Sequence, residues 1–371
     1  MIKISNRIKV AIAGYGFAKK VHYEALNDSD NFEVVSFFHP NKEKKDLIEE
    51  ETGLECSPDW NKLIARNDID AIVIATPPEN RFKYAKDALI HNKHLLLEKP
   101  VCLKSIEIEE LQRIALTRNL IVGVNFEYRV VPLFLQTKQI IEENFFGQIF
   151  LIKLDWLMGS RADPNREWDW YSSEDEGGGV IGALGTHAFD MLNWFFGDTK
   201  RISGRISTSI SKRIDHNKKL QKVTSEDICL SNLDIVNFRN EITPCQVSLS
   251  SISKSGRGFS LEIYGRDGSL FLKSENQTDY VHGFNLNIFD KSNKLKNINA
   301  IDSFLFDKTW TDGRIAPVKR IHDLWAKSIK DSIPIIPGLN EGLQSQLICE
   351  AIKKSSKTGL TVNIDTMNGI M

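Results

Sequence analysis

The first third of the chain alternates short apolar runs with polar or amphipathic stretches of helical length. The apolar runs predict buried strands over residues 8–13, 33–38, 71–75, 94–97 and 120–124. The stretches between them predict helices over residues 17–26, 41–51, 60–66 and 81–91, and one more that begins with Ser105 as its N-cap. Strands that alternate with helices form βαβ units. Residues 1–125 are therefore predicted to form an α/β Rossmann domain with a doubly wound parallel sheet.

Beyond residue 125 the pattern changes, because from about residue 201 to residue 290 long strands follow one another without helices between them. Helices are predicted over residues 133–143, 181–196, 316–330 and 338–356. Strands are predicted over residues 149–156, 201–209, 227–237, 245–252, 259–264 and 269–273, with turns such as Gly265-Arg266-Asp267-Gly268 between them. Residues 126–371 are therefore predicted to form an α+β domain with one large, mostly antiparallel sheet.

Composition narrows the class of protein. A chain of 371 residues with 41% hydrophobic and 26% charged residues is typical of a globular protein with two domains. The net charge of −1 gives no field that would attract nucleic acid or an anionic membrane. The five cysteines include no C-x-x-C pair, and the first residues lack the pattern of a signal peptide. We therefore expect a cytoplasmic protein without a disulfide framework, a metal site, a membrane partner or a nucleic-acid partner.

A glycine-rich turn links the first predicted strand to the first helix, with the sequence Gly14-Tyr15-Gly16-Phe17-Ala18-Lys19. Gly14 permits a tight turn, and Gly16 lets the backbone approach a pyrophosphate at the helix N-terminus. Strand, turn and helix together predict a dinucleotide site. Lys19 stands where a third glycine is usual, and it either points to solvent or reaches a cofactor phosphate.

The end of the second strand bears on the choice of cofactor. An acidic residue there would accept hydrogen bonds from the adenine ribose, but His39 takes this position. Without a carboxylate a 2′-phosphate is not repelled, and Lys42, Lys44 and Lys45 supply positive charge nearby. The pattern leans toward NADP over NAD. The alternative is that His39 packs beside the adenine or lies on the surface.

Further motifs bring a family into view. Ala75-Thr76-Pro77-Pro78 and Glu98-Lys99-Pro100 each end a parallel strand, Gly177-Gly178-Gly179 precedes a helix with Gly185-Thr186-His187 and Asp190, and Gly265-Arg266-Asp267-Gly268-Ser269-Leu270 lies late in the sheet. In this combination the chain, from about residue 8 to residue 364, resembles the Gfo/Idh/MocA family, the relatives of glucose–fructose oxidoreductase and inositol dehydrogenase. The resemblance implies reversible hydride transfer between NAD(P) and the hydroxyl or keto carbon of a sugar, sugar acid or cyclitol. It also implies an open sheet face that meets the nicotinamide, and a homodimer or homotetramer formed through the large sheet.

The resemblance and the dinucleotide pattern together predict the cofactor-binding residues Gly14, Tyr15, Gly16, Phe17, Ala18, His39, Ala75, Thr76, Pro77, Glu98, Lys99 and Pro100. Lys99 is also predicted to be catalytic, because an ammonium beside the substrate hydroxyl favours alkoxide character while hydride leaves. The resemblance implies a cis peptide bond before Pro100, and X-Pro is where such bonds are tolerated.

The predicted helix over residues 181–196 carries the second catalytic candidate. At about 100° per residue, Ala183, His187, Asp190 and Trp194 fall on one stripe. His187 is predicted to be the general base, because a neutral imidazole accepts a proton near pH 7. Ala183 stands where inositol-dehydrogenase-like members carry an Asp, so Asp190 or water would orient His187. Asp190 alternatively binds a substrate hydroxyl or caps local backbone. The three glycines before the helix are expected to leave a space that a substrate fills.

Three more residues are predicted to bind substrate: Asn125, Arg129 and Trp168. Arg129, near the hinge, would clamp a carboxylate or hydroxyls, or else form a structural salt bridge. Trp168 lies in an aromatic, arginine-rich segment over residues 161–171, and it would stack on a sugar face or else pack against the sheet edge. Two other functions stay open: a cofactor-binding sensor without turnover, and different chemistry on the same fold, as in tetrapyrrole reductases or NAD-dependent glycosidases.

Overall fold

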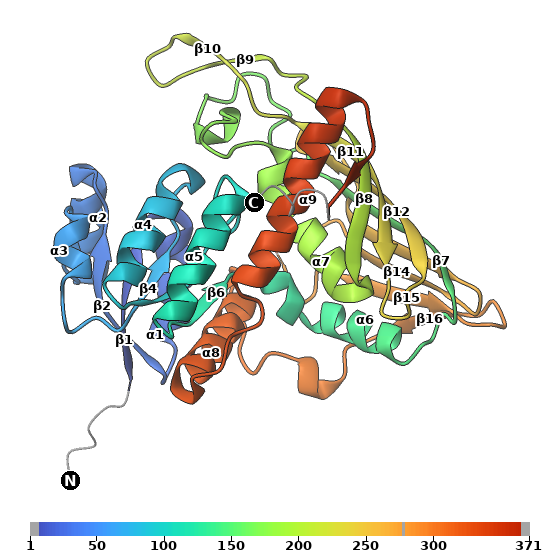
Figure 1. Cartoon of the computed structure of the whole chain (residues 1–371), viewed down its shortest axis with the longest axis horizontal. Coiled ribbons are helices and arrows are strands. Elements are labelled where there is room, and N and C mark those ends of the chain that lie inside the picture. The colour runs from blue at the N-terminus through green and yellow to red at the C-terminus, as the bar shows by residue number, and fades with distance from the viewer. Residues whose placement is uncertain (1–6, 277–278, 365–371) are drawn as a thin grey trace. The chain divides into compact units, whose positions relative to one another are not determined.

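The computed structural model describes residues 7–276 and 279–364, which fold as two compact units (Figure 1). Of the described residues, the first unit holds 7–127 and 308–343. The second holds 128–276, 279–307 and 344–364. The sequence pattern suggests one boundary between the two domains, at residue 125. In the structure, residues 308–343 also belong to the first unit.

The first unit is built on a parallel sheet of six strands in the order β3-β2-β1-β4-β5-β6, the order of a doubly wound dinucleotide fold. The strands are β1 (Ile8–Ala13), β2 (Phe32–Phe38), β3 (Cys56–Ser57), β4 (Ala71–Ile74), β5 (His94–Leu97) and β6 (Val122–Val124). The helical elements are η1 (Ala18–Tyr23), α1 (Glu24–Asn27), α2 (Lys42–Thr52), α3 (Trp60–Ile64), α4 (Pro78–Ile90), α5 (Ser105–Thr117) and α8 (Ile315–Asp331).

Apolar side chains cover both faces of this sheet. Alternate strand residues such as Ala11, Ile72 and Leu95 pack against α3, α4 and α5, which lie side by side in Figure 1. On another face of the unit, Ile315 and Val318 of α8 pack with Val21 and Ala25, which follow the glycine turn. The indole of Trp325 also stacks on Phe32 at 5.3 Å. Burial of this apolar face of α8 explains why residues 308–343 belong to the first unit.

Two helix starts differ from the sequence prediction. The helix expected over residues 17–26 is a π-helix, η1, followed by the short α1. Ser105 is not an N-cap but the first residue of α5, and Lys104 holds the N-cap position. The reason is that the backbone N–H of Lys104 donates to the carboxylate of Glu107 at 3.2 Å, as in a capping box.

The second unit is built on a nine-stranded sheet in the order β16-β15-β14-β13-β7-β12-β11-β8-β17. All neighbouring pairs in it are antiparallel except β7 with β12. Its strands are β7 (Ile149–Leu157), β8 (Asp198–Ser207), β11 (Ile228–Val236), β12 (Ile242–Ser250), β13 (Gly258–Gly265), β14 (Ser269–Ser274), β15 (Asn285–Phe289), β16 (Leu295–Ile298) and β17 (Val362–Asn363), beside a separate pair, β9 (Lys212–Ile214) and β10 (Leu220–Lys222).

Helices cover one face of the large sheet. They are α6 (Pro132–Glu142), α7 (Thr186–Phe196) and the later part of α9 (Leu339–Thr358). The short helical segments are η2 (Glu127–Val130), η3 (Trp170–Ser172), η4 (Ile181–Gly185) and η5 (Asp302–Phe304). Phe134 of α6 packs on Phe259 of β13 at 5.5 Å, and Ile352 of α9 lies 3.0 Å from the Cβ position of Gly204 on β8. The helix expected over residues 181–196 is divided, because η4 is a π-helix and only α7 has regular α-helical geometry.

Candidate active site

The glycine turn after β1 leaves room for a ligand. Gly14 has a φ of 123°, and a Cβ there would lie 2.7 Å from the carbonyl oxygen of Ala75. Beside the Cβ position of Gly16, by contrast, no heavy atom of the described residues lies within 4 Å, its chain neighbours aside. The helical segment begins directly after this turn, and a helix start favours a phosphate. The turn therefore fits the pyrophosphate of a dinucleotide.

Glu51 of α2 engages two residues of this turn. The Lys19 ammonium lies 3.1 Å from its carboxylate, and the Tyr15 hydroxyl donates to it at 3.3 Å. Lys44 lies 4.9 Å above the centre of the Tyr15 ring. The pairing with Glu51 favours the interpretation in which Lys19 points away from a cofactor phosphate.

His39 lies just beyond β2, about half-buried. Its Nδ1 accepts a hydrogen bond from the backbone N–H of Asn41 at 3.1 Å. Burial lowers the pKa of His39, and the charge of Lys44 lowers it further. A neutral His39 leaves this edge without a negative charge. Lys45 is held by Glu49 at 2.5 Å, so Lys44 is the better placed of the two for a 2′-phosphate.

Arg81 ties together the two loops that end β4 and β5. Its guanidinium donates to the carbonyl oxygens of Glu98 at 2.7 Å, of Pro100 and of Thr76. Burial lowers the pKa of Arg81 to about 10, against the opposing charge of Glu98, so the group stays charged at neutral pH. The structure shows that it fixes the Glu98-Lys99-Pro100 segment, in which the Lys99–Pro100 bond is cis.

The carboxylate of Glu98 is surrounded by hydrogen-bond donors. Asn125 Nδ2 donates to Oε1 at 2.6 Å, His22 Nε2 lies 3.0 Å from the same oxygen, and the Lys99 backbone N–H donates to Oε2 at 3.2 Å. Burial alone would raise the pKa of Glu98, but the hydrogen bond and charge of His22 and the charges of Lys99 and Arg81 bring it below its ordinary value. Glu98 is therefore an ionised anchor at the carboxyl end of β5.

Lys99 and Glu127 form an electrostatic pair at this edge. Burial lowers the pKa of the Lys99 ammonium, while the charges of Glu127 and Glu98 act against that change. Burial also raises the pKa of Glu127 to about 8, the charge of Glu98 adds to this, and the charge of Lys99 opposes it. At neutral pH most Glu127 side chains therefore carry a proton, beside Lys99 and an ionised Glu98. Two carboxyl groups whose environments separate their pKa values are typical of active sites.

Two buried polar atoms at the same edge of the sheet have no hydrogen-bond partner among the described residues. They are Thr76 Oγ1 and Asn125 Oδ1. Asn125 is fully buried, and Thr76 follows β4 directly. Because buried polar atoms are almost always paired, such atoms indicate a place for a ligand. Together with the open space at Gly16, they show that the first unit is suited to a dinucleotide along the carboxyl ends of its strands.

In the second unit His187 lies on the first turn of α7, 4% exposed. The ring of Tyr128 meets it edge-on at 5.0 Å, and Trp156 of β7 lies 6.4 Å away. The Tyr128 hydroxyl donates to that of Tyr280 at 2.9 Å. The imidazole is therefore held by an aromatic wall, which fixes its plane without supplying a charge.

Arg129 and Asp190 bind each other. The guanidinium donates through Nε at 2.8 Å and through Nη2 at 2.7 Å to the two carboxylate oxygens, and both side chains are buried. This geometry favours the structural salt bridge over a clamp for substrate. It also places the Asp190 carboxylate on Arg129, so the orientation of His187 by Asp190 remains only a prediction.

Sequence comparisons decide the family. A profile described as "Oxidoreductase family, NAD-binding Rossmann fold" matches residues 8–126. A second, described as "Oxidoreductase family, C-terminal alpha/beta domain", matches residues 138–364. The chain belongs to the Gfo/Idh/MocA family of oxidoreductases. The resemblance predicted from the motifs is thereby confirmed, as is the pairing of a Rossmann domain with a large, mostly antiparallel sheet.

Individual members of the Gfo/Idh/MocA family cover almost the whole chain. An uncharacterised oxidoreductase of Synechocystis sp. is 37% identical over 354 residues, which is 95% of this chain and 94% of that protein. Glucose-6-phosphate 3-dehydrogenase of Bacillus subtilis is 22% identical and covers 97% of this chain and 99% of its own. The solved structure of levoglucosan dehydrogenase with NADH and levoglucosan is similar in fold, with a TM-score of 0.85 at 22% identity, over 96% of this chain and 99% of that one.

The glycine triplet of this Gfo/Idh/MocA chain does not leave the space that the sequence suggested. A Cβ on Gly178 would collide with the carbonyl oxygen of Tyr171, and one on Gly179 would collide with the carboxylate of Glu226. That carboxylate accepts a hydrogen bond from the backbone N–H of Ile181 at 2.9 Å. The expectation of a substrate space here is therefore wrong, because the protein itself fills it. The glycines instead let Glu226 reach the start of η4.

Trp168 lies in a segment that packs on the β9–β10 pair. Its indole N–H donates to the carbonyl oxygen of Lys222 at 3.0 Å. Nearby, Arg161 binds Asp169 at 2.8 Å and lies 4.1 Å from the centre of the Tyr171 ring. Arg213 donates to three backbone carbonyls of the same segment. These contacts favour the packing interpretation of Trp168 over stacking on a sugar.

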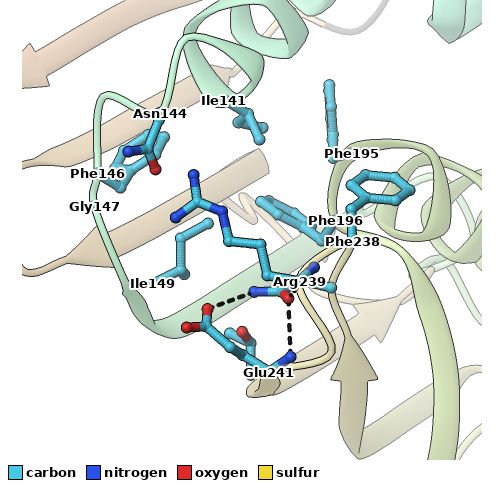
Figure 2. A pocket seen from close by; sticks show the side chains of 12 residues that line it. Ile141, Asn144, Phe146, Gly147, Ile149, Phe195, Phe196, Phe238, Arg239 and Glu241 are labelled. Atoms are coloured by element: carbon cyan, nitrogen blue, oxygen red, sulfur yellow. Dashed lines mark hydrogen bonds between the residues drawn. The ribbon is translucent and has the colours of Figure 1, made fainter.

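One open pocket of the second unit lies apart from these residues. Figure 2 shows it between Ile141, Ile149, Phe195 and Phe196, with Arg239 at its side. The described residues that line it include none that the sequence marked as catalytic or substrate-binding, so it does not contribute to the proposed site.

Within residues 7–276 and 279–364, no group of three or more His, Cys, Asp or Glu side chains is arranged to hold a metal ion. The helices of the described chain include none with the length and apolar character needed to span a membrane.

Sequence reasoning missed His22, Glu127, His322 and Glu226. Each is a buried ionisable side chain that contacts the candidate site or its supports. His22 and Glu127 lie close in sequence to motifs that were recognised. His322 and Glu226 come from distant segments, so only the fold could bring them in.

Proposed function

We propose that this NAD(P)-binding oxidoreductase interconverts a hydroxyl and a keto group on a sugar, sugar acid or cyclitol. The names of two relatives, glucose-6-phosphate 3-dehydrogenase and levoglucosan dehydrogenase, support a sugar-like substrate. The observation that carries the proposal is the arrangement at the end of β5. There an ionised Glu98, held by fixed donors, presents Lys99 beside a protonated Glu127 at the edge where open α/β sheets bind ligands.

The first unit would hold the cofactor. Gly14 to Ala18 would cradle the pyrophosphate, His39 would lie near the adenine ribose, and Ala75 to Pro77 with Glu98 to Pro100 would border the nicotinamide. Thr76 Oγ1 and Asn125 Oδ1 offer the polar partners for it that the protein itself does not use. Bound NAD(P) supplies the nicotinamide carbon that accepts or returns the hydride.

Lys99 and His187 would share the chemistry of the substrate oxygen. In the oxidative direction the Lys99 ammonium would donate a hydrogen bond to that oxygen, and His187 would take its proton while the C–H hydride leaves.

The test is turnover of a panel of sugars, sugar acids and cyclitols with NADP⁺ and NAD⁺. We expect Lys99→Met, which keeps the apolar stem, and His187→Asn each to lower kcat by about 10² to 10⁴. Binding of the reduced cofactor, measured by fluorescence, should change little in His187→Asn. Lys62→Met and His216→Asn, at exposed positions, are the matched controls. Cofactor binding without turnover of any substrate would instead support a sensor. Cofactor that stays bound through purification would support an internal-oxidant glycosidase.

We also propose a preference for NADP, a homo-oligomer formed through the large sheet, and a cytoplasmic location. The neutral His39 and the exposed Lys44 support the first proposal. The exposed apolar side chains Leu230 and Ile242, on β11 and β12, support the second. A sedimentation experiment that finds only monomer at micromolar concentration would contradict the oligomer, and cell fractionation tests the location.

A further inference from the structure

Three buried side chains form a hydrogen-bonded chain from α8 to the end of β5. His322 Nε2 lies 3.0 Å from His22 Nδ1, and His22 Nε2 lies 3.0 Å from Glu98 Oε1. Both imidazoles are fully buried. His22 and His322 are 300 positions apart in the sequence, and α8 brings them together by packing on η1 and α1.

The direction of these hydrogen bonds follows from the ends of the chain. Glu98 is an ionised acceptor, so His22 Nε2 must carry a proton and donate to it. Burial holds the pKa of His322 well below its ordinary value, so His322 is neutral. Its Nδ1 has no partner among the described residues. A buried acceptor without a partner is tolerated better than a buried N–H without one, which places the single proton of His322 on Nε2. His322 thus donates to His22, and His22 donates to Glu98.

This chain acts on the backbone of Lys99. Glu98 Oε1 accepts hydrogen bonds from His22 and Asn125, and Glu98 Oε2 accepts one from the backbone N–H of Lys99. The donors together fix the rotamer of the Glu98 side chain. Its carboxylate in turn fixes the backbone of Lys99, from which the Lys99 side chain extends. Arg81 holds the same segment through its carbonyl groups but does not touch the carboxylate in these bonds. The orientation of Glu98 therefore depends on the two histidines and Asn125.

We propose that His22 and His322 are positioning residues for Lys99, acting through Glu98. The proposal rests on the proposed function, in which Lys99 donates to the substrate oxygen. Loss of the His22 donor frees the carboxylate to turn, and a displacement of about 1 Å at a catalytic group costs about 10²-fold in rate. Loss of His322 leaves His22 Nδ1 buried without a donor, a smaller disturbance one step farther from Lys99.

Substitution by leucine and by glutamine separates hydrogen bonding from packing. Gln at position 22 keeps an N–H for Glu98 and an oxygen for His322, whereas Leu keeps only bulk. We expect His22→Leu to lower kcat about 30- to 100-fold with the substrate KM within about 3-fold, and His22→Gln to stay within about 5-fold of the parent. For His322→Leu we expect a loss of about 5- to 10-fold, largely recovered in His322→Gln. Equal kcat values for folded Leu and Gln variants at position 22 would overturn the proposal.

Two further measurements do not depend on turnover. Imidazole ¹⁵N NMR should show a proton on Nε2 of His22 and on Nε2 of a neutral His322, and a proton on His322 Nδ1 would overturn the proposal. Residue-resolved acylation of lysines should show that His22→Leu changes the labelling rate of Lys99 at least 3-fold relative to Lys62, whereas His22→Gln does not. If no substrate is turned over but this labelling pattern holds, the proposed function fails and the positioning role stands. Unchanged labelling of Lys99 in His22→Leu would refute the positioning role itself.

Discussion

The protonated state of Glu127 gives a prediction that can be measured as stability. Glu127 is 4% exposed, and burial together with the charge of Glu98 raises its pKa from 4.5 to about 8. In the unfolded chain the carboxyl group ionises near its ordinary value. Because the folded-state pKa is raised, the stabilisation is fully present below about pH 4.5 and is lost as pH rises through about 8. We expect Glu127→Gln, which mimics the protonated acid and cannot ionise, to remove this loss.

The size of the effect follows from the two pKa values. Between 4.5 and about 8, each pH unit changes the free energy of unfolding by about 1.4 kcal/mol, which gives an upper bound of about 5 kcal/mol. At pH 5 the variant and the parent should therefore agree to within about 1 kcal/mol. By pH 8.5 the variant should be more stable by about 3 to 5 kcal/mol, since only the parent must ionise a buried carboxyl group.

The assay is urea unfolding of both proteins in one buffer series from pH 5 to pH 9. Only the difference between the two is interpreted, so groups shared by both cancel. Glu50→Gln, at an exposed position of α2, is the control, and its difference from the parent should not change with pH. A Glu127→Gln difference that stays constant across the series would show that Glu127 does not titrate between these values, and the electrostatic account of the Lys99 pair would have to be abandoned.

Two other predictions concern the glycine triplet and the cofactor. Gly179→Ala puts a methyl group against the Glu226 carboxylate at a φ of 101°, so we expect the free energy of unfolding to fall by at least about 2 kcal/mol. The loss should exceed that of the control Gly53→Ala, because Gly53 also has a positive φ but open space around it. Equal losses would mean that the Glu226 side chain moves aside at little cost. Lys44→Ala should weaken NADPH binding about 5- to 30-fold and leave NADH binding within about 2-fold, whereas equal weakening of both cofactors would contradict the proposed role of Lys44 at the 2′-phosphate.

Five of the six strands of the first unit could be predicted because they are largely buried, whereas β3, of two residues, was missed. The leucines at positions 95–97, for example, are fully buried and form an apolar run, and β5 has the predicted bounds of 94–97. The strands that were missed carry a weaker signal. β16 lies at the edge of the second sheet with mostly exposed positions, so it shows neither an apolar run nor a clean alternation. Edge strands are specified by the strand they pair with rather than by their own sequence.

The return of residues 308–343 to the first unit could not be predicted for a related reason. The periodicity of α8 shows that it has an apolar face, but not which surface that face covers. The partners of this face, among them Val21 and Phe32, lie in the first unit almost 300 positions earlier. The chain of His322, His22 and Glu98 depends on this same packing, which is why a buried network that supports a recognised motif stayed invisible in the sequence.

The failure of helical periodicity at two places has one physical cause. The helices after the Gly14–Gly16 turn and the Gly177–Gly179 triplet each begin as a π-helix: η1 contains His22, and η4 ends two residues before His187. A π-helix has more residues per turn than an α-helix, so a stripe drawn at 100° per residue cannot be carried across it. Ala183 lies within η4, and its place relative to His187 therefore cannot be read from α-helical spacing. The missing Asp at position 183 is for this reason a weaker argument against catalysis than the sequence alone suggested. The stronger argument lies in the groups that the fold does place: an aromatic wall that fixes His187, and a set of buried donors that fixes Glu98 and, through it, Lys99.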